Sequence, residues 1–184
     1  AALAALPAEA ARPAPRAGLF RHGVASGDPD PTSVVLWTRV TTTGEVDVAW
    51  ELASDAGFAR IVAKGTFATG PDRDHTVKVL AEGLEPGARY FYRFRAAGET
   101  SPVGRTRTLP VGRLERLGIA LASCSNFAFG YFNAYDAIAR DPLIDFVLHT
   151  GDYIYEYGAD GWGADVARKL GRVHQPANEI VSLA

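Results

Sequence analysis

Short β-strand patterns fill the sequence from Gly23 to Leu109 and restrict the folds available to that part of the chain. VVLWTRV (34–40) and VDVAWELA (46–53) are rich in β-branched and aromatic residues, and the turn-forming stretch TTTGE lies between them. Further strand patterns cover residues 61–67 and 75–80. No helical period of any length interrupts this series, so we expect antiparallel strands packed as a sandwich.

The segment GLEPGARYFYRFRAAG supports this interpretation. It places Tyr90, Tyr92 and Phe94 on one face of a strand, and the alternation is typical of a half-buried strand. Leu84-Glu85-Pro86, just ahead of Tyr90, resembles the fibronectin type III pattern around its tyrosine corner. Residues 19–110 are therefore predicted to form an all-β sandwich of fibronectin III or Ig-like type. Such modules more often bind a partner or act as spacers between domains than catalyse a reaction.

Composition excludes several classes of protein. The chain has 184 residues, of which 47% are hydrophobic and 22% charged, as in an ordinary globular protein. A formal net charge of -2 provides no basic face for nucleic acid, so we expect no nucleic-acid partner. One cysteine excludes a disulfide within the chain, and no apolar stretch is long enough for a transmembrane segment. We expect a monomer.

The first 18 residues, AALAALPAEAARPAPRAG, contain little that could build a core. Two interpretations remain open: a flexible lead-in left from an export signal, or a low-complexity tail. The chain contains no methionine, so its initiator is missing and we expect the sequence to be incomplete.

The pattern changes in residues 111–184, which are predicted to begin an α/β domain. LGIALA (117–122) and LIDFVLH (143–149) are continuous apolar runs, as expected for strands buried on both faces. Between them YFNAYDAIAR has helical spacing, and Asp141-Pro142 ends that helix because proline restricts the residue before it. Strand, helix and strand within ~30 residues predict a right-handed βαβ unit.

Polar residues follow both predicted strands. Ser-Cys-Ser-Asn comes after the first and Gly-Asp after the second, and ligands bind beyond the carboxyl ends of parallel strands. If the strands are neighbours, Cys124 and Asp152 point into one crevice, and Tyr155 returns to it within a turn of chain. Thiolate, carboxylate and phenolate together favour a metal ion, best a trivalent iron, because tyrosine alone titrates near ~10. Asp152 has a second oxygen that can bridge to a harder cation.

Each residue also has an ordinary structural interpretation. A cysteine at a strand end often serves packing, Tyr155 can belong to an aromatic cluster with Tyr153 and Tyr157, and Asp152 can cap a turn. Their coincidence at paired strand ends favours the metal site. Two weaker candidates are Asn126, as a polar contact in the crevice, and Glu156, which either orders the site or is solvated. His149 is interpreted as a core histidine or one that supports the site.

Two long motifs carry a family resemblance. SCSNFAFGYFNAYDAIARDPLIDFVLHTGDYIYEYG (123–158) closely resembles the opening of the metallophosphatase domain of PhoD-like alkaline phosphatases, also called phosphodiesterase/alkaline phosphatase D. FRHGVASGDPDPTSVVLWTRV (20–40) resembles the N-terminal β-sandwich domain of that family, and GRVHQPANEIVSLA (171–184) its next stretch. GDYIY (151–155) also matches the GDxxY element of the wider purple acid phosphatase group.

The resemblance implies a calcineurin-like metallophosphatase domain from residue 111 onward. It implies that Cys124 and Tyr155 are ligands of iron(III) (Fe³⁺) and that Asp152 bridges to calcium (Ca²⁺), with a metal-bound hydroxide or oxo group in the attack on a phosphate ester. It further implies a secreted or periplasmic enzyme, exported by the twin-arginine route, that hydrolyses phosphate mono- and diesters.

One departure from the family limits this expectation. The later family elements, which hold asparagine and histidine ligands and a Trp-Asp-Asp-His-Glu stretch, have no counterpart here. We therefore expect a truncated metallophosphatase domain and a fragment that is inactive alone. The alternatives are a non-catalytic fibronectin-like binding or spacer module with a vestigial α/β domain, and a zinc or manganese hydrolase with the same fold.

Overall fold

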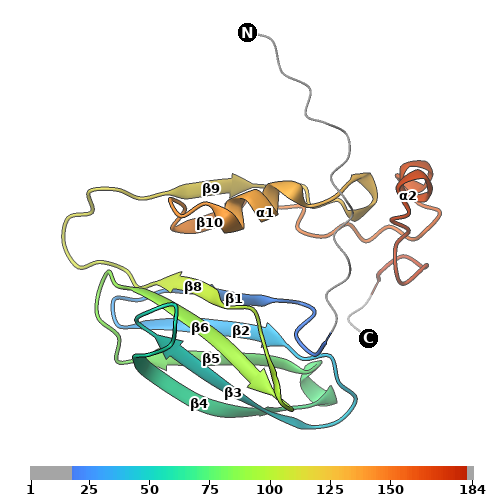
Figure 1. Ribbon diagram of the computed structural model, residues 1–184. Coiled ribbons are helices and arrows are strands. Elements are labelled where there is room, and N and C mark those ends of the chain that lie inside the picture. Colours follow the sequence, from blue (N-terminus) through green and yellow to red (C-terminus); the bar gives the residue numbers. More distant parts are fainter. Residues whose placement is uncertain (1–17, 182–184) are drawn as a thin grey trace. The chain divides into compact units, whose positions relative to one another are not determined.

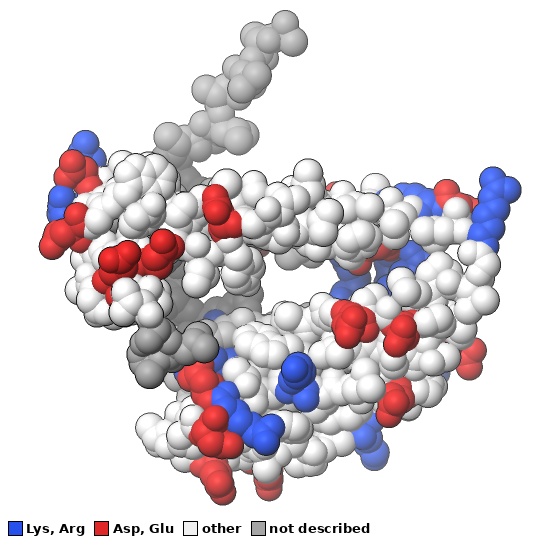
Figure 2. Space-filling model, turned by 180° about the vertical axis from the view of Figure 1, so that it is seen from behind, with Lys and Arg blue, Asp and Glu red and all other residues white. Residues whose placement is uncertain are grey.

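The computed structural model describes residues 18–181, which divide into two compact units between Arg113 and Leu114 (Figure 1). The predicted lead-in, residues 1–18, lies outside the described residues except for Gly18. No helix within residues 18–181 is both long enough and apolar enough to cross a membrane. On the face shown in Figure 2, lysine and arginine side chains are interspersed with aspartate and glutamate.

The first unit consists of two antiparallel sheets. One has the strand order β1-β2-β5, and the other has the order β4-β3-β6, with β7 and β8 both paired to β6. A short 3₁₀ turn, η1 (Pro71–Arg73), lies between β4 and β5. The strands are β1 (Val24–Gly27), β2 (Ser33–Arg39), β3 (Val46–Ala53), β4 (Ile61–Thr69), β5 (Thr76–Glu82), β6 (Arg89–Ala96), β7 (Glu99–Thr100) and β8 (Gly104–Arg107).

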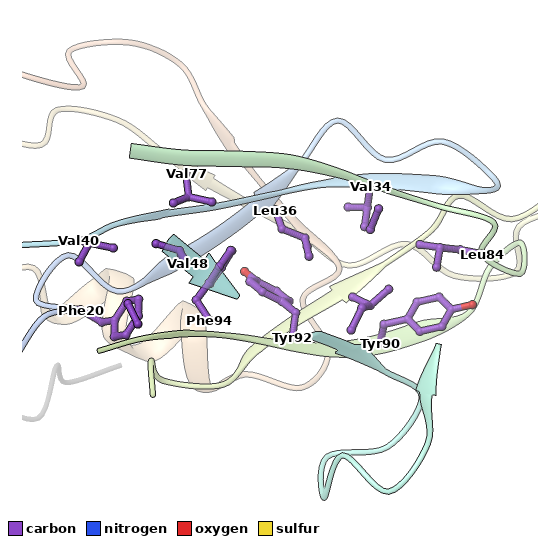
Figure 3. Close-up of a cluster of buried hydrophobic side chains, with 13 residues drawn as sticks. Phe20, Val34, Leu36, Val40, Val48, Val77, Leu84, Tyr90, Tyr92 and Phe94 are labelled. Carbon is purple, nitrogen blue, oxygen red and sulfur yellow. The ribbon is translucent and has the colours of Figure 1, made fainter. Parts of the chain in front are cut away.

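Alternate residues of these strands build the core between the two sheets. Leu36 of β2, Leu52 of β3 and Phe94 of β6 are fully buried and belong to one cluster with Tyr90 and Tyr92 (Figure 3). Figure 3 shows side chains of β2 and β5 facing those of β6. The predicted common face of Tyr90, Tyr92 and Phe94 is therefore present, and the mostly-β character is confirmed.

The Tyr90 side chain closes the loop that precedes its strand. Its hydroxyl accepts a hydrogen bond from the backbone N–H of Glu85 at 2.8 Å, as the tyrosine of a tyrosine corner bonds to the backbone a few residues upstream. Burial raises the pKa of the neighbouring Tyr92 to about 12 because the phenolate would lose its hydration.

Gly104 of β8 is paired with Tyr92 of β6, and its missing side chain makes room for the tyrosine ring. A Cβ at residue 104 would lie 2.2 Å from Cζ of Tyr92, and Tyr92 is only 2% exposed. We expect Gly104→Ala to lower the free energy of unfolding by ~1–3 kcal/mol, as overpacking usually does. The matched control is Gly27→Ala in β1, where nothing lies within 4 Å of the added Cβ. Urea denaturation of both variants is the measurement, and equal midpoints would contradict the prediction.

The second unit begins with a strand, a helix and a parallel strand. β9 (Ile119–Ala122) and β10 (Phe146–His149) pair in parallel, with Ile119 opposite Phe146 and Ala122 opposite His149. Between them are the 3₁₀ turn η2 (Phe127–Phe129) and α1 (Asn133–Arg140), and α2 (Ala164–Leu170) follows β10. α1 ends before Asp141-Pro142 as the sequence predicts, with Asp141 in an extended conformation.

The expectation that both strands are buried on both faces is wrong for this structure. Leu121 is 68% exposed and Leu148 is 50% exposed, and Ile119 and Phe146 are also exposed. Among the described residues β9 and β10 pair only with each other, and helices do not cover both faces of their sheet. β9 and β10 are also shorter than predicted, since Asp145 turns back to donate its N–H to the Gly118 carbonyl at 2.8 Å.

Candidate functional site

The segments that follow β9 and β10 remain side by side after the strands end. The N–H of Thr150 donates to the carbonyl of Ala122 at 2.9 Å. Next, the N–H of Cys124 donates to the Gly151 carbonyl at 3.2 Å, and that of Ser125 donates to the Asp152 carbonyl at 2.8 Å. Parallel pairing therefore extends past the sheet edge and brings the two polar segments together at its carboxyl end.

Two residues of this site have a backbone conformation that L-amino acids seldom adopt. Cys124 has φ 59° and Asp152 has φ 50°, both in the left-handed region, and Gly151 beside Asp152 has φ 120°. Aspartate enters that region more readily than most residues, whereas for cysteine it costs ~1–3 kcal/mol. Such a conformation persists where the surrounding structure holds it, and it concentrates at functional sites.

The left-handed turns direct three predicted ligand side chains toward one another. The Cys124 sulfur lies 3.6 Å from Oδ2 of Asp152, and the Tyr155 hydroxyl donates to the same Oδ2 at 3.1 Å. The Cys124 thiol also interacts with the Tyr155 hydroxyl. Cys124 and Asp152 are exposed, so the cluster is open to solvent. The structure thus brings together groups that are 28 positions apart in the sequence.

The surroundings of Tyr155 favour its neutral phenol. Its pKa is raised well above the ordinary value, first by the hydrogen bond with Cys124, then by desolvation and by the Asp152 carboxylate. These groups surround the phenolic oxygen with electron-rich acceptors. Thiol, carboxylate and phenol groups are also donors that can bind a cation, and a bound cation would invert this effect because it stabilises the phenolate.

The donor set suits a cation but does not complete its coordination. Sulfur, carboxylate and phenol oxygen converge, and Cys124 and Asp152 are the two members that commonly bind metals. Within residues 18–181 no group of three or more His, Cys, Asp and Glu residues is arranged to hold a metal ion. Most metal sites take at least four ligands. These three side chains therefore fit only part of a metal site, because they supply fewer donors than most metal sites use.

The Tyr155 ring also belongs to an aromatic cluster, so both interpretations of this residue apply. The ring stacks on Tyr157 with centroids 6.3 Å apart and approaches Trp162 at 6.2 Å. Tyr153 instead packs edge-on against His149 at 5.2 Å. Aromatic packing thus fixes the Tyr155 ring while its hydroxyl reaches Asp152. A cavity of about 470 Å³ lies beside these rings and is lined mainly by aromatic side chains.

The two weaker candidates have different positions. Asn126 uses Oδ1 to accept from the N–H of Ala128 at 3.0 Å, which caps η2, and its buried Nδ2 has no hydrogen-bond partner among the described residues. The Glu156 side chain is exposed, and its backbone carbonyl accepts from the N–H of Ile180 at 2.9 Å. Asn126 therefore shapes the loop after Cys124, while Glu156 extends into solvent.

Sequence reasoning missed a hydrogen-bond cluster directly behind these residues. Ser125, Tyr135 and His149 each lie within hydrogen-bond distance of the other two. The sequence contained a partial signal, since Ser125 follows Cys124 and His149 ends the second strand pattern. For Tyr135 the sequence predicts only a place in the helix, because nothing in it shows which strand residue faces the tyrosine hydroxyl.

Comparison with known families matches nearly the whole chain. The family described as "PhoD-like phosphatase, N-terminal domain" matches residues 5–110, and "PhoD-like phosphatase" matches residues 119–184. The two matches lie one on either side of the boundary between the two compact units.

Individual relatives agree with the family matches. The chain is 43% identical to "Alkaline phosphatase D" of Bacillus subtilis (strain 168) over 175 residues, which cover 89% of this chain and 29% of that protein. A solved structure described as "Structure of PhoD" aligns with a TM-score of 0.72 and 46% identity, over 76% of this chain and 29% of that one. The chain thus spans about 29% of the length of these relatives. Two family matches in the expected order, together with 43% identity, show that this chain belongs to the PhoD-like phosphatase family.

Proposed function

We propose that this chain is part of a metal-dependent phosphoesterase that hydrolyses phosphate mono- and diesters, in the manner of an alkaline phosphatase D. The observation that carries the proposal is the convergence of Cys124, Asp152 and Tyr155 at the carboxyl ends of two parallel strands. Family membership supports the phosphoesterase class. In this proposal residues 111–184 begin a calcineurin-like metallophosphatase domain, and residues 19–110 form the sandwich domain ahead of it.

The proposed ligands favour iron(III) beside calcium. Cys124 and Tyr155 would bind iron as thiolate and phenolate, which need a highly charged ion to stay deprotonated near neutral pH. Asp152 makes both of its side-chain contacts through Oδ2, so among the described residues Oδ1 has no hydrogen-bond partner. That free oxygen supports the proposal that Asp152 bridges to a calcium ion.

The residues of the chain would act by holding charge in place. Two metal ions ~3.5–4 Å apart stabilise both the attacking and the leaving oxygen of a phosphoryl transfer. Asp152 would fix their separation, while Cys124 and Tyr155 would balance the charge of one ion. The Tyr155 ring, packed on Tyr157 and Trp162, would restrict the position of its oxygen.

The substrate class and the location are expected from the family, and the absence of a nucleic-acid partner is expected from the net charge of -2. We expect the substrate to be a phosphate ester, with no nucleic-acid partner and a monomeric enzyme. We expect a secreted or periplasmic location reached by the twin-arginine route. Because the described donor set is incomplete, we expect the 184-residue chain alone to be inactive and the full-length protein to supply the missing ligands.

Metal analysis of the purified full-length protein, combined with visible absorption, tests the proposal. We expect iron and calcium in the protein and a tyrosinate-to-iron absorption band. A chelator that removes the metals should abolish the colour and the phosphatase activity together. A colourless, iron-free and inactive protein would instead favour the non-catalytic binding or spacer module. An active protein with zinc or manganese would preserve the hydrolase class and replace the iron.

A further inference from the structure

His149 connects the two segments that contain the proposed ligands. Its Nε2 lies 3.0 Å from the hydroxyl of Ser125, the residue after Cys124. Its ring packs edge-on against Tyr153, the residue after Asp152, with centroids 5.2 Å apart and an interplanar angle of 79°. One imidazole at the end of β10 therefore contacts the immediate neighbour of each of two ligand residues.

Tyr135 of α1 completes this arrangement. Its hydroxyl lies 2.5 Å from the Ser125 hydroxyl and 3.0 Å from Nε2 of His149. All three residues are partly buried, which strengthens hydrogen bonds relative to those in water. The cluster thus joins three parts of the second unit: the segment after β9, helix α1 and strand β10.

The other nitrogen of His149 indicates how the protons are distributed. The N–H of Gly151 donates to Nδ1 at 3.4 Å, so Nδ1 is the acceptor. With Nδ1 as the acceptor, Nε2 carries a ring proton and can donate it to one of the two hydroxyls. His149 therefore uses both nitrogens, one toward the turn that precedes Asp152 and one toward the residue that follows Cys124.

These contacts surround the two left-handed residues. Cys124 at φ 59° and Asp152 at φ 50° keep an unfavourable backbone conformation only if their neighbours are held. Ser125 is held by its hydroxyl, Gly151 by Nδ1 of His149, and Tyr153 by packing against the imidazole ring. The backbone hydrogen bonds from Cys124 and Ser125 to the opposite segment supply the remaining constraint.

We propose that His149, Ser125 and Tyr135 are positioning residues that hold the Cys124 and Asp152 turns in the conformation in which their side chains converge. This inference rests on the proposed function, because it assigns the cluster a role in metal binding. None of the three residues needs to touch the metal or the substrate. Partners that orient ligands in this way typically contribute 10- to 100-fold to metal affinity.

The decisive experiment compares Ser125→Thr with Ser125→Val in the full-length protein. Threonine and valine have nearly the same shape, and only threonine retains the hydroxyl that contacts His149 and Tyr135. We expect the threonine variant to bind iron like the unmodified protein. The valine variant should bind iron ~10-fold more weakly and show a shifted tyrosinate-to-iron band. Iron affinity is measured by competition with a chelator, and the band by visible spectroscopy.

Tyr135→Phe, which keeps the ring and removes the hydroxyl, should have the same effect. Its matched control is Tyr131→Phe, because Tyr131 lies just before α1 and its hydroxyl has one hydrogen-bond partner within residues 18–181, the Leu170 carbonyl at 3.3 Å. We expect the control to keep the iron affinity and the band. Thermal unfolding of the metal-free proteins is measured in parallel.

The outcomes separate this inference from the proposed function. An unmodified protein without iron, an absorption band or phosphatase activity would contradict the proposed function itself. An unmodified protein with the band, together with equal affinity and spectra for the threonine and valine variants, would overturn the positioning role alone. Lower thermal stability with unchanged iron affinity would assign the cluster to packing of α1 and would also overturn the inference.

Discussion

Replacing Tyr155 with phenylalanine is expected to abolish the visible absorption band and to lower kcat/KM of the full-length protein by ~100-fold or more. The change removes one oxygen, the atom that donates to Oδ2 of Asp152 at 3.1 Å, and keeps the ring that packs on Tyr157 and Trp162. Loss of a partner that only orients a ligand costs ~10–100-fold in metal affinity, so loss of a ligand oxygen should cost at least as much. Visible spectroscopy, metal analysis and steady-state kinetics are the measurements.

The matched control is Tyr157→Phe. Tyr157 belongs to the same aromatic cluster, with its ring 6.3 Å from that of Tyr155, so the two variants make the same chemical change in one environment. We expect the Tyr157 variant to keep its colour, iron content and turnover. Full colour and turnover in the Tyr155 variant would show that its ring alone matters, and would remove this residue from the ligand set.

Asp152→Asn is the second change for which we expect a large effect. It preserves the size of the side chain and removes the negative charge, so the residue can no longer bridge two cations as a carboxylate. Asparagine adopts the left-handed region as readily as aspartate, so φ 50° at this position is retained and the backbone is not strained further. We expect loss of calcium, weakened iron binding and a decrease of ~100-fold or more in kcat/KM, on the same reasoning as for Tyr155.

The first unit offers a matched control for this change. Asp28 is also an exposed aspartate with a left-handed backbone, at φ 49°, and it lies in the loop between β1 and β2. Asp28→Asn should leave metal content and turnover unchanged. Retention of both metals and normal turnover by the Asp152 variant would refute its bridging role.

Much of the sandwich was predictable because its signal is local. The side chains of a β-strand alternate between two faces, so the order of residues in RYFYRFRA already assigns Tyr90, Tyr92 and Phe94 to the buried face. The end of α1 before Asp141-Pro142 was also predictable, since proline restricts the residue directly before it. Both predictions depend on neighbours within a few positions along the chain.

Burial of β9 and β10 was not predictable in this way. Apolar runs such as LGIALA indicate strands that can be buried, but burial requires other elements to cover them. In the described structure the two strands have only each other as sheet partners, and Leu121 remains 68% exposed. The composition of a segment shows whether the segment can be buried, but it does not show which other elements pack against it.

The sequence by itself determined the strand patterns, the βαβ order and the chemical types of the residues after each strand, because these depend on periodicity and on residue identity. Only the tertiary structure decided that the Cys124 thiol and the Tyr155 hydroxyl both contact Oδ2 of Asp152. It also decided that Cys124 and Asp152 have left-handed backbones, and that His149 contacts both Ser125 and Tyr135. The physical reason is distance along the chain. Contacts between residues 28 positions apart depend on the register of two parallel strands, and no local pattern encodes that register.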